Sequence, residues 1–261
     1  FRAVGSAAAL DWRAVVVAAS VSALVGGVLI LVAGRVGPFD EPAPRLSIDS
    51  ARRAFGSSAV RLANLGYLGH MWELYAMWTW IPVFLLASFT AAGVADPALA
   101  SLAAFLVVSL GGVGCVAAGL LADRLGRTVL TIGAMAVSGT AAVLTGLLFG
   151  ADPLLVTLVA VVWGITVVAD SAQFSAAVSE LTPPGTAGTA LTLQTAAGFT
   201  LTSVTIVLVG LLGGLDPDAA DNADAWRIAF IVLALGPAVG IVAMHRLRGR
   251  PEANRMAGGR R

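Results

Sequence analysis

The sequence has few of the residues on which soluble enzymes and nucleic-acid-binding proteins depend. Charged side chains make up 12% of its 261 residues, whereas a soluble domain averages about 25%. Lysine is absent, all 16 basic residues are arginine, and a net charge of +1 offers no basic surface to nucleic acid. A single cysteine, Cys115, excludes an internal disulfide, and the only histidines, His70 and His245, indicate no zinc site. We therefore expect no nucleic-acid partner, no metal and no cofactor.

What the sequence has in excess is apolar surface. Hydrophobic residues make up 58% of the chain, and its mean hydropathy is +0.89. A helix of about 20 apolar residues crosses the hydrocarbon core of a bilayer. Seven segments are long and apolar enough: Arg13–Ala33, Leu62–Ala91, Pro97–Leu121, Thr128–Leu148, Leu154–Ser179, Gly188–Leu212 and Arg227–Met244. The sequence predicts an all-α membrane protein with seven transmembrane helices, and the lipid bilayer is an expected partner.

The charges between these segments sort by side. One side carries most of the arginines, namely Arg35, Arg45, Arg52, Arg53, Arg61, Arg124, Arg127, Arg246, Arg248, Arg250, Arg255, Arg260 and Arg261. The other side carries aspartates with few arginines, namely Asp96, Asp152, Asp216, Asp218, Asp221 and Asp224 with Arg2, Arg13 and Arg227. Because arginine accumulates in cytoplasmic loops, we expect a multi-pass protein of the cell (inner) membrane with its C-terminus in the cytoplasm. An odd number of spans then places Phe1 outside, which suggests the downstream part of a longer protein.

Two segments of the arginine-rich side connect or follow the spans. The connection Gly34–Arg61 is too polar to span, and Ser47–Arg61 within it can form a short amphipathic helix on the membrane surface. A plain flexible linker is the alternative. Residues 247–261 are expected to form a basic cytoplasmic tail. At the other side, Trp78, Trp80 and Trp226 are interpreted as interfacial anchors, since tryptophan favours the headgroup level.

One nine-residue loop carries a recognisable pattern. The stretch Gly119-Leu-Leu-Ala-Asp123-Arg124-Leu-Gly126-Arg127 concentrates three charges between two uncharged apolar runs, which marks a tight turn at a membrane surface. It matches the G-x-L-A-D-R-x-G-R signature of the major facilitator superfamily, which the chain therefore resembles. In that family the signature lies between helices 2 and 3, with a copy between helices 8 and 9. Two spans separate the arginine-rich linker from this loop, so the second copy fits.

The resemblance implies how the chain is organised. Residues 1–33 would be the last helix of the N-terminal half, 34–61 the central cytoplasmic linker, and 62–246 the C-terminal six-helix bundle. The seven spans would be helices 6 to 12, and the missing N-terminal half would be a partner. The loop would act as a gating latch that holds the two halves together. Gly119 and Gly126 allow close helix contact and a tight turn, Asp123 accepts hydrogen bonds from a neighbouring helix N-terminus, and Arg124 and Arg127 pair with carboxylates or anionic lipid head groups. The plainer alternative is that these charges only terminate two helices.

Polar residues inside the spans are candidates for a substrate or proton-coupling site, because such residues are costly in a bilayer. Glu73 lies eleven residues beyond Leu62, about 17 Å at 1.5 Å per residue, and Asp170 lies about 15 Å before Glu180. Gln194 lies about 12 Å beyond Thr186 by the same rise. The three polar side chains are therefore expected at comparable depth near the midplane, where transporters hold substrate.

Neighbouring polar residues extend this candidate site. His70 is three residues from Glu73 and shares its helix face, Gln173 is three residues from Asp170, and Tyr67 belongs to the aromatic-rich span of Glu73. Glu73 beside His70 could carry a proton, with Asp170 as a second carrier or as counter-ion for a cationic substrate. Structural roles are the alternatives: pairing of Glu73 with His70 or with the missing half, hydrogen bonding of Asp170 to backbone or hydroxyls, and interhelical contacts of Gln194.

The expected function is alternating-access transport of a small solute. The carboxyls of Glu73 and Asp170 would allow this transport to be coupled to protons. The aromatic residues of the second span favour a small organic metabolite or drug as substrate. A small inorganic anion of the nitrate, nitrite or cyanate type is the alternative, and a truncated non-transporting remnant is another. We expect no enzyme, since the G-x-S-G setting of intramembrane serine proteases and the paired acids of intramembrane aspartyl enzymes are not found. The repeated pore loop of a channel is not found either.

Overall fold

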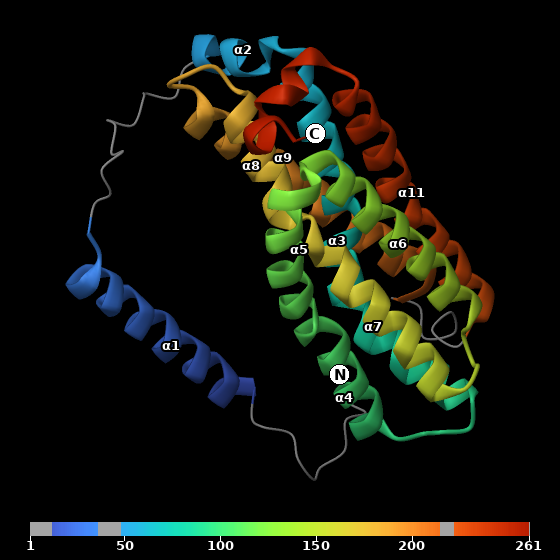
Figure 1. The fold of residues 1–261 in the computed structure, drawn as a ribbon. Helices are drawn as coiled ribbons and strands as arrows, with labels where there is room; N and C mark the ends of the chain where they lie inside the picture. The colour runs from blue at the N-terminus through green and yellow to red at the C-terminus, as the bar shows by residue number, and fades with distance from the viewer. Residues whose placement is uncertain (1–11, 36–47, 215–221, 261) are drawn as a thin grey trace. The chain divides into compact units, whose positions relative to one another are not determined.

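The computed structural model describes residues 12–35, 48–214 and 222–260, and it divides into two units, Phe1–Ala43 and Pro44–Arg261. The first unit contains helix α1, Trp12–Ala33 (Figure 1), which is mostly apolar but contains Arg13 near its start. The arginines and aspartates at positions 2, 45, 216, 218, 221 and 261 lie outside the described residues. So do residues 1–11 of the segment assigned to the N-terminal half and residues 36–47 of the polar linker.

The second unit is a bundle of helices. In chain order these are α2 (Ile48–Gly56), α3 (Ser58–Ala91), α4 (Pro97–Ser109), α5 (Gly111–Leu125), α6 (Arg127–Leu147), α7 (Pro153–Ala169), α8 (Ser171–Leu181), α9 (Ala187–Val209), the π-turn η1 (Gly210–Gly214), α11 (Ala223–Arg248) and the 3₁₀ segment η2 (Pro251–Gly259). Together with α1, the described residues hold seven helices that are long and apolar enough to cross a membrane. The prediction of an all-α protein with seven spans is therefore confirmed.

Two of the spans contain a single-residue turn at which the backbone keeps a right-handed helical conformation, a local irregularity that the sequence did not lead us to expect. The third span consists of α4 and α5, with Leu110 between them, and the fifth consists of α7 and α8, with Asp170 between them. At the second turn the amide of Gln173 donates to the carbonyl of Asp170, three residues back. This is the tighter 3₁₀ pattern, which inside a helix often marks a hinge. By contrast, α3, α6 and α11 run without interruption.

A short amphipathic helix does form in the segment predicted for one. It is α2, which lies across one end of the bundle in Figure 1, with Ser50 and Ala54 buried and Arg52 exposed. Ser57 then caps α3, its hydroxyl accepting a hydrogen bond from the amide of Ala59 at 3.2 Å. Because of this cap, α3 begins at Ser58, four residues before the expected start.

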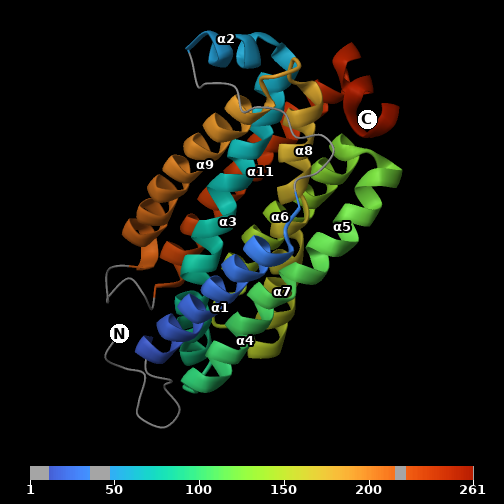
Figure 2. The same ribbon diagram turned by 90° about the vertical axis from the view of Figure 1, so that its left-hand side faces the viewer.

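Helix α11 packs along both α3 and α6 and so ties these uninterrupted helices together (Figures 1 and 2). The approach of α3 to α11 is closest where glycines face each other. A Cβ added at Gly69 would lie 2.5 Å from the carbonyl oxygen of Gly236. Small residues of this kind let helix backbones approach within a membrane, where packing drives helix association. We refer to α3, α6 and α11 as the scaffold.

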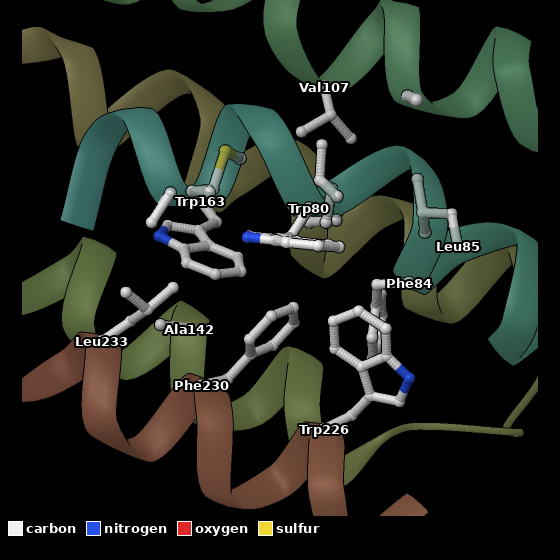
Figure 3. Close-up of a cluster of buried hydrophobic side chains, with 14 of the residues drawn as sticks. Trp80, Phe84, Leu85, Val107, Ala142, Trp163, Trp226, Phe230 and Leu233 are labelled. Atoms are coloured by element: carbon white, nitrogen blue, oxygen red, sulfur yellow. The ribbon is translucent and has the colours of Figure 1, made fainter. Parts of the chain in front are cut away.

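The other end of the bundle is filled by aromatic rings, shown in Figure 3. Trp226, Phe84 and Phe230 contact one another with ring centroids 4.7 to 5.7 Å apart, and Trp163 lies 5.0 Å from Phe230. Trp80 donates its indole N–H to the carbonyl of Ile206. The interpretation of Trp80 and Trp226 as interfacial anchors is therefore wrong: both are buried in the core, because neighbouring helices supply ring partners and a carbonyl acceptor.

The final segment, expected to be a basic tail, packs on the bundle. Helix α11 continues to Arg248, and η2 then turns back against the end of α8. Ala253 and Met256 of η2 are fully buried, in one apolar cluster with Leu181 of α8 and Leu247 of α11. The hydrophobic side chains of the segment therefore anchor it, although most of its charged residues are arginines.

The glycine contact between α3 and α11 leads to a stability prediction. Gly69→Ala places a methyl group against the backbone of Gly236, which must move away, and overpacking of this kind costs roughly 1–3 kcal/mol. We expect a clearly lower melting temperature for the purified protein in detergent. Gly112→Ala is the matched control, since nothing lies within 4 Å of a Cβ there. Equal melting temperatures for the two variants would contradict the assigned contact.

Candidate functional site

The centre of the candidate site is Glu73, which α3 presents to α6 and α7. Its side chain is 1% exposed, and both carboxyl oxygens accept hydrogen bonds from neighbouring helices. The indole N–H of Trp163 donates to Oε1 at 2.7 Å, and the hydroxyl of Ser138 donates to Oε2 at 2.9 Å. Glu73 thus joins three spans from inside the bundle and does not pair with His70.

Ser138 has a second acceptor within reach. Its hydroxyl lies 3.3 Å from the carbonyl oxygen of Met135, one turn earlier in α6. A hydroxyl has one hydrogen to donate and two lone pairs with which to accept. Ser138 can therefore donate to Glu73 when the carboxyl is charged. When the carboxyl is protonated, it can accept from Glu73 and donate to Met135.

His70 pairs with the turn between α7 and α8. Its Nδ1 lies 2.9 Å from Oδ1 of Asp170, and its Nε2 lies 2.8 Å from the hydroxyl of Ser171. His70 and Asp170 are 2% and 1% exposed. The structure thus brings His70 and Asp170 together, and the two residues that contact His70 lie at the turn between α7 and α8. The pair can share a proton between imidazole and carboxyl.

Tyr67 and Gln194 complete the buried polar set on the side of α9. The ring of Tyr67 lies 6.2 Å from those of His70 and Phe174, and its hydroxyl interacts with the side chain of Thr195. Gln194 is 2% exposed, yet neither its amide oxygen nor its amide nitrogen has a hydrogen-bond partner among the described residues. A buried amide of this kind calls for a ligand or an ordered water.

Gln173 does not belong to this site. Its amide oxygen accepts from Nη1 of Arg127 at 2.6 Å, which places it in a second polar cluster at the arginine-rich end of the bundle. There Arg127 also donates from Nε and Nη2 to the two carboxyl oxygens of Glu180, at 2.8 and 2.6 Å. Two parallel hydrogen bonds of this type make a strong guanidinium–carboxylate pair. Arg127 of the signature loop therefore has a carboxylate partner within the bundle.

Of the other residues of the signature loop, only Gly126 has the local role expected for it. Gly126 has φ 92° and joins α5 to α6, a backbone conformation that favours glycine, so the tight turn expected there is present. The close helix contact expected at Gly119 is not found in the described part of the chain, because a Cβ there would meet nothing within 4 Å. Asp123 and Arg124 are exposed, and the backbone carbonyl of Asp123 accepts a hydrogen bond from Arg260.

Two residues of these clusters were not among the expected ones. Ser138 is one of several hydroxyl residues in its span, and these commonly bond to their own helix backbone, so the sequence does not single it out. In the sequence, Glu180 served only as the end of a span from which the depth of Asp170 was counted. Its separation of 53 residues from Arg127 gave no local spacing from which to infer the pair.

Comparison with known proteins agrees with the motif and the helices. The family model described as Major Facilitator Superfamily matches residues 3–205. No curated protein matches the chain significantly. The match covers more than half of the chain, including the signature loop and the spans that carry Glu73, His70, Asp170 and Gln194. The seven apolar helices and this match show a multi-pass membrane protein, and the chain belongs to the major facilitator superfamily of secondary transporters.

Proposed function

We propose that this chain forms the C-terminal half of a proton-coupled transporter that moves a small organic solute by alternating access. In this assignment residues 62–246 form one bundle, residues 1–33 end the N-terminal half, and 34–61 link the halves at the cytoplasmic face. The arginine-rich end, with the C-terminus, faces the cytoplasm of a cell (inner) membrane. Alternating access needs two bundles that rock against each other, so the N-terminal half is a required partner.

The observation that carries proton coupling is the hydrogen bonding of Glu73. A buried carboxyl that takes up and releases a proton needs partners suited to both of its states, because an unpaired polar group in hydrocarbon is costly. Trp163 donates to one oxygen in either state. Ser138 serves the other oxygen as donor or as acceptor, since Met135 offers its hydroxyl an alternative acceptor. Glu73 can therefore change charge without leaving a polar atom unpaired.

The pair of His70 and Asp170 supplies a second proton-binding group close by. His70 lies one helical turn from Glu73, and the charges of Glu73 and Asp170 interact. We assign Glu73 as the proton carrier and Asp170, held by His70, as the second candidate carrier.

An aromatic surface supports an organic substrate. Tyr75 and Trp78 of α3 and Phe199 of α9 contact one another with centroids 5.2 to 5.3 Å apart. Phe199 is 48% exposed, and the indole N–H of Trp78 has no acceptor among the residues that the structure describes. Such a surface offers stacking area, which suits a solute with an apolar body. Tyr67 and Gln194 lie on the same two helices and would extend it.

Glu73→Gln tests the proton carrier. Glutamine keeps both hydrogen bonds, accepting from Trp163 and donating to Ser138, but it cannot release a proton. In vesicles containing both halves of the transporter, we expect solute accumulation driven by a pH gradient to be lost. Exchange of labelled for unlabelled solute is expected to continue. A screen of organic solutes and of nitrate, nitrite and cyanate, followed with a pH-sensitive dye, identifies the substrate to be used.

The matched control for this experiment is Glu252→Gln, a carboxyl of η2 away from the site. Accumulation that persists in Glu73→Gln would remove Glu73 as the carrier, and persistence in Asp170→Asn as well would remove proton coupling through this site. A dye response to an inorganic anion alone would overturn the organic substrate. A complete absence of transport with both halves present would favour a remnant.

Trp78→Phe tests the substrate surface. The substitution keeps an aromatic ring but reduces its stacking area, and an aromatic contact of this kind is worth roughly 0.5–1.5 kcal/mol. We expect KM for the transported solute to rise by about twofold to tenfold, with little change in the maximal rate. Trp72→Phe is the comparison, because that indole donates to the carbonyl of Val232 and holds α3 to α11. A higher KM in Trp72→Phe but not in Trp78→Phe would contradict the assignment.

A further inference from the structure

The third and fifth spans lie side by side. Gly111, which begins α5, faces α7, since a Cβ there would lie 3.0 Å from the carbonyl oxygen of Gly164. The thiol of Cys115 donates to the carbonyl of Val168 at 3.5 Å, two residues before the turn at Asp170. Leu110 is therefore level with the part of α7 near Gly164, six residues before Asp170. Beyond Asp170, α8 continues beside α5 to the arginine-rich end.

The ends of α5 and α8 are bound by residues of α6 and of η2, which follows α11. Arg127 is the first residue of α6, and its guanidinium binds Glu180 of α8. From η2, Arg255 donates to the carbonyls of Leu181 and Thr182 at 3.1 and 3.3 Å. These are the last, otherwise unpaired carbonyls of α8, and a cation there also complements the helix dipole.

Two further hydrogen bonds complete the attachment of η2. The backbone amide of Ala257 donates to Oε2 of Glu180 at 3.2 Å, so that this carboxylate is bound by both α6 and η2. Arg260 donates to the backbone carbonyl of Asp123 at the end of α5. Met256, fully buried, packs in the apolar cluster that includes Val178 of α8.

We propose that η2 is a clasp that locks α8, together with the end of α5, to the scaffold, and that α8 rotates about the turn at Asp170 when the clasp opens. Helices that pack against each other over their full length move as one body. A short helix that follows a turn within a span, such as α8, needs contacts of its own to stay in place. Arg127 and η2 provide such contacts from opposite sides of one carboxylate. The clasp would then regulate the movement that the proposed transport function requires. Only this regulatory role rests on the proposed function; the contacts of η2 with α8 do not.

Hydrogen exchange of the backbone amides tests the clasp directly. In the full transporter without substrate, Arg255→Ala removes two charge-assisted hydrogen bonds, and we expect the amides of residues 174–181 to exchange about tenfold faster. The amides of α7 and α6 are expected to keep their rates. Met256→Ala, which removes only the apolar anchor, is expected to act in the same direction. Arg246→Ala, an exposed arginine of α11, is the matched control and is expected to change nothing.

A double-mutant cycle tests whether both sets of contacts act as one lock. If Arg127 and η2 hold α8 jointly through Glu180, the effects of Arg127→Ala and Arg255→Ala on α8 exchange are non-additive; independent contacts would simply add. Unchanged exchange in α8, or an equal rise in α7 and α8, would overturn the clasp. Because this readout needs no substrate, failure of the unaltered protein to transport would refute the proposed function and leave the clasp standing.

Discussion

The placement of Glu73 is the constraint on which the rest of the bundle depends. A carboxyl inside a membrane protein must find all of its partners within the protein, since the lipid supplies none. Glu73 finds them on two other spans, from Trp163 of α7 and Ser138 of α6. These bonds fix the relative height of three helices. The aromatic packing around Trp163 and Phe230 then begins directly beside a polar contact, so core and candidate site share a residue.

The bundle combines two kinds of helix. The scaffold helices are uninterrupted, and glycines allow α3 and α11 to pack with their backbones almost in contact. The helices that pack against them contain the turns at Leu110 and Asp170, and Asp170 is also the partner of His70. The contacts of η2 at the far end of α8 and the His70–Asp170 pair at its near end are joined by an eleven-residue helix.

Much of the architecture could be predicted from the sequence, because the signals were strong and local. Seven apolar runs give seven spans, and the signature loop at Gly119–Arg127 gives the family. What could not be predicted depends on contacts between distant residues. Trp80 and Trp226 are indistinguishable from interfacial anchors until their partners are known. The assignment of Gln173 failed for the same reason, since its neighbour in sequence is Asp170 but its partner in space is Arg127. The roles of the site residues themselves remain predictions that transport measurements must decide.

The thiol of Cys115 has a consequence for experiment. It is the single cysteine of the chain, it is exposed, and its thiol donates to the carbonyl of Val168, two residues before Asp170. A spin label or fluorophore attached there would report on the contact between the third and fifth spans near Asp170, with no background cysteines of this chain to remove.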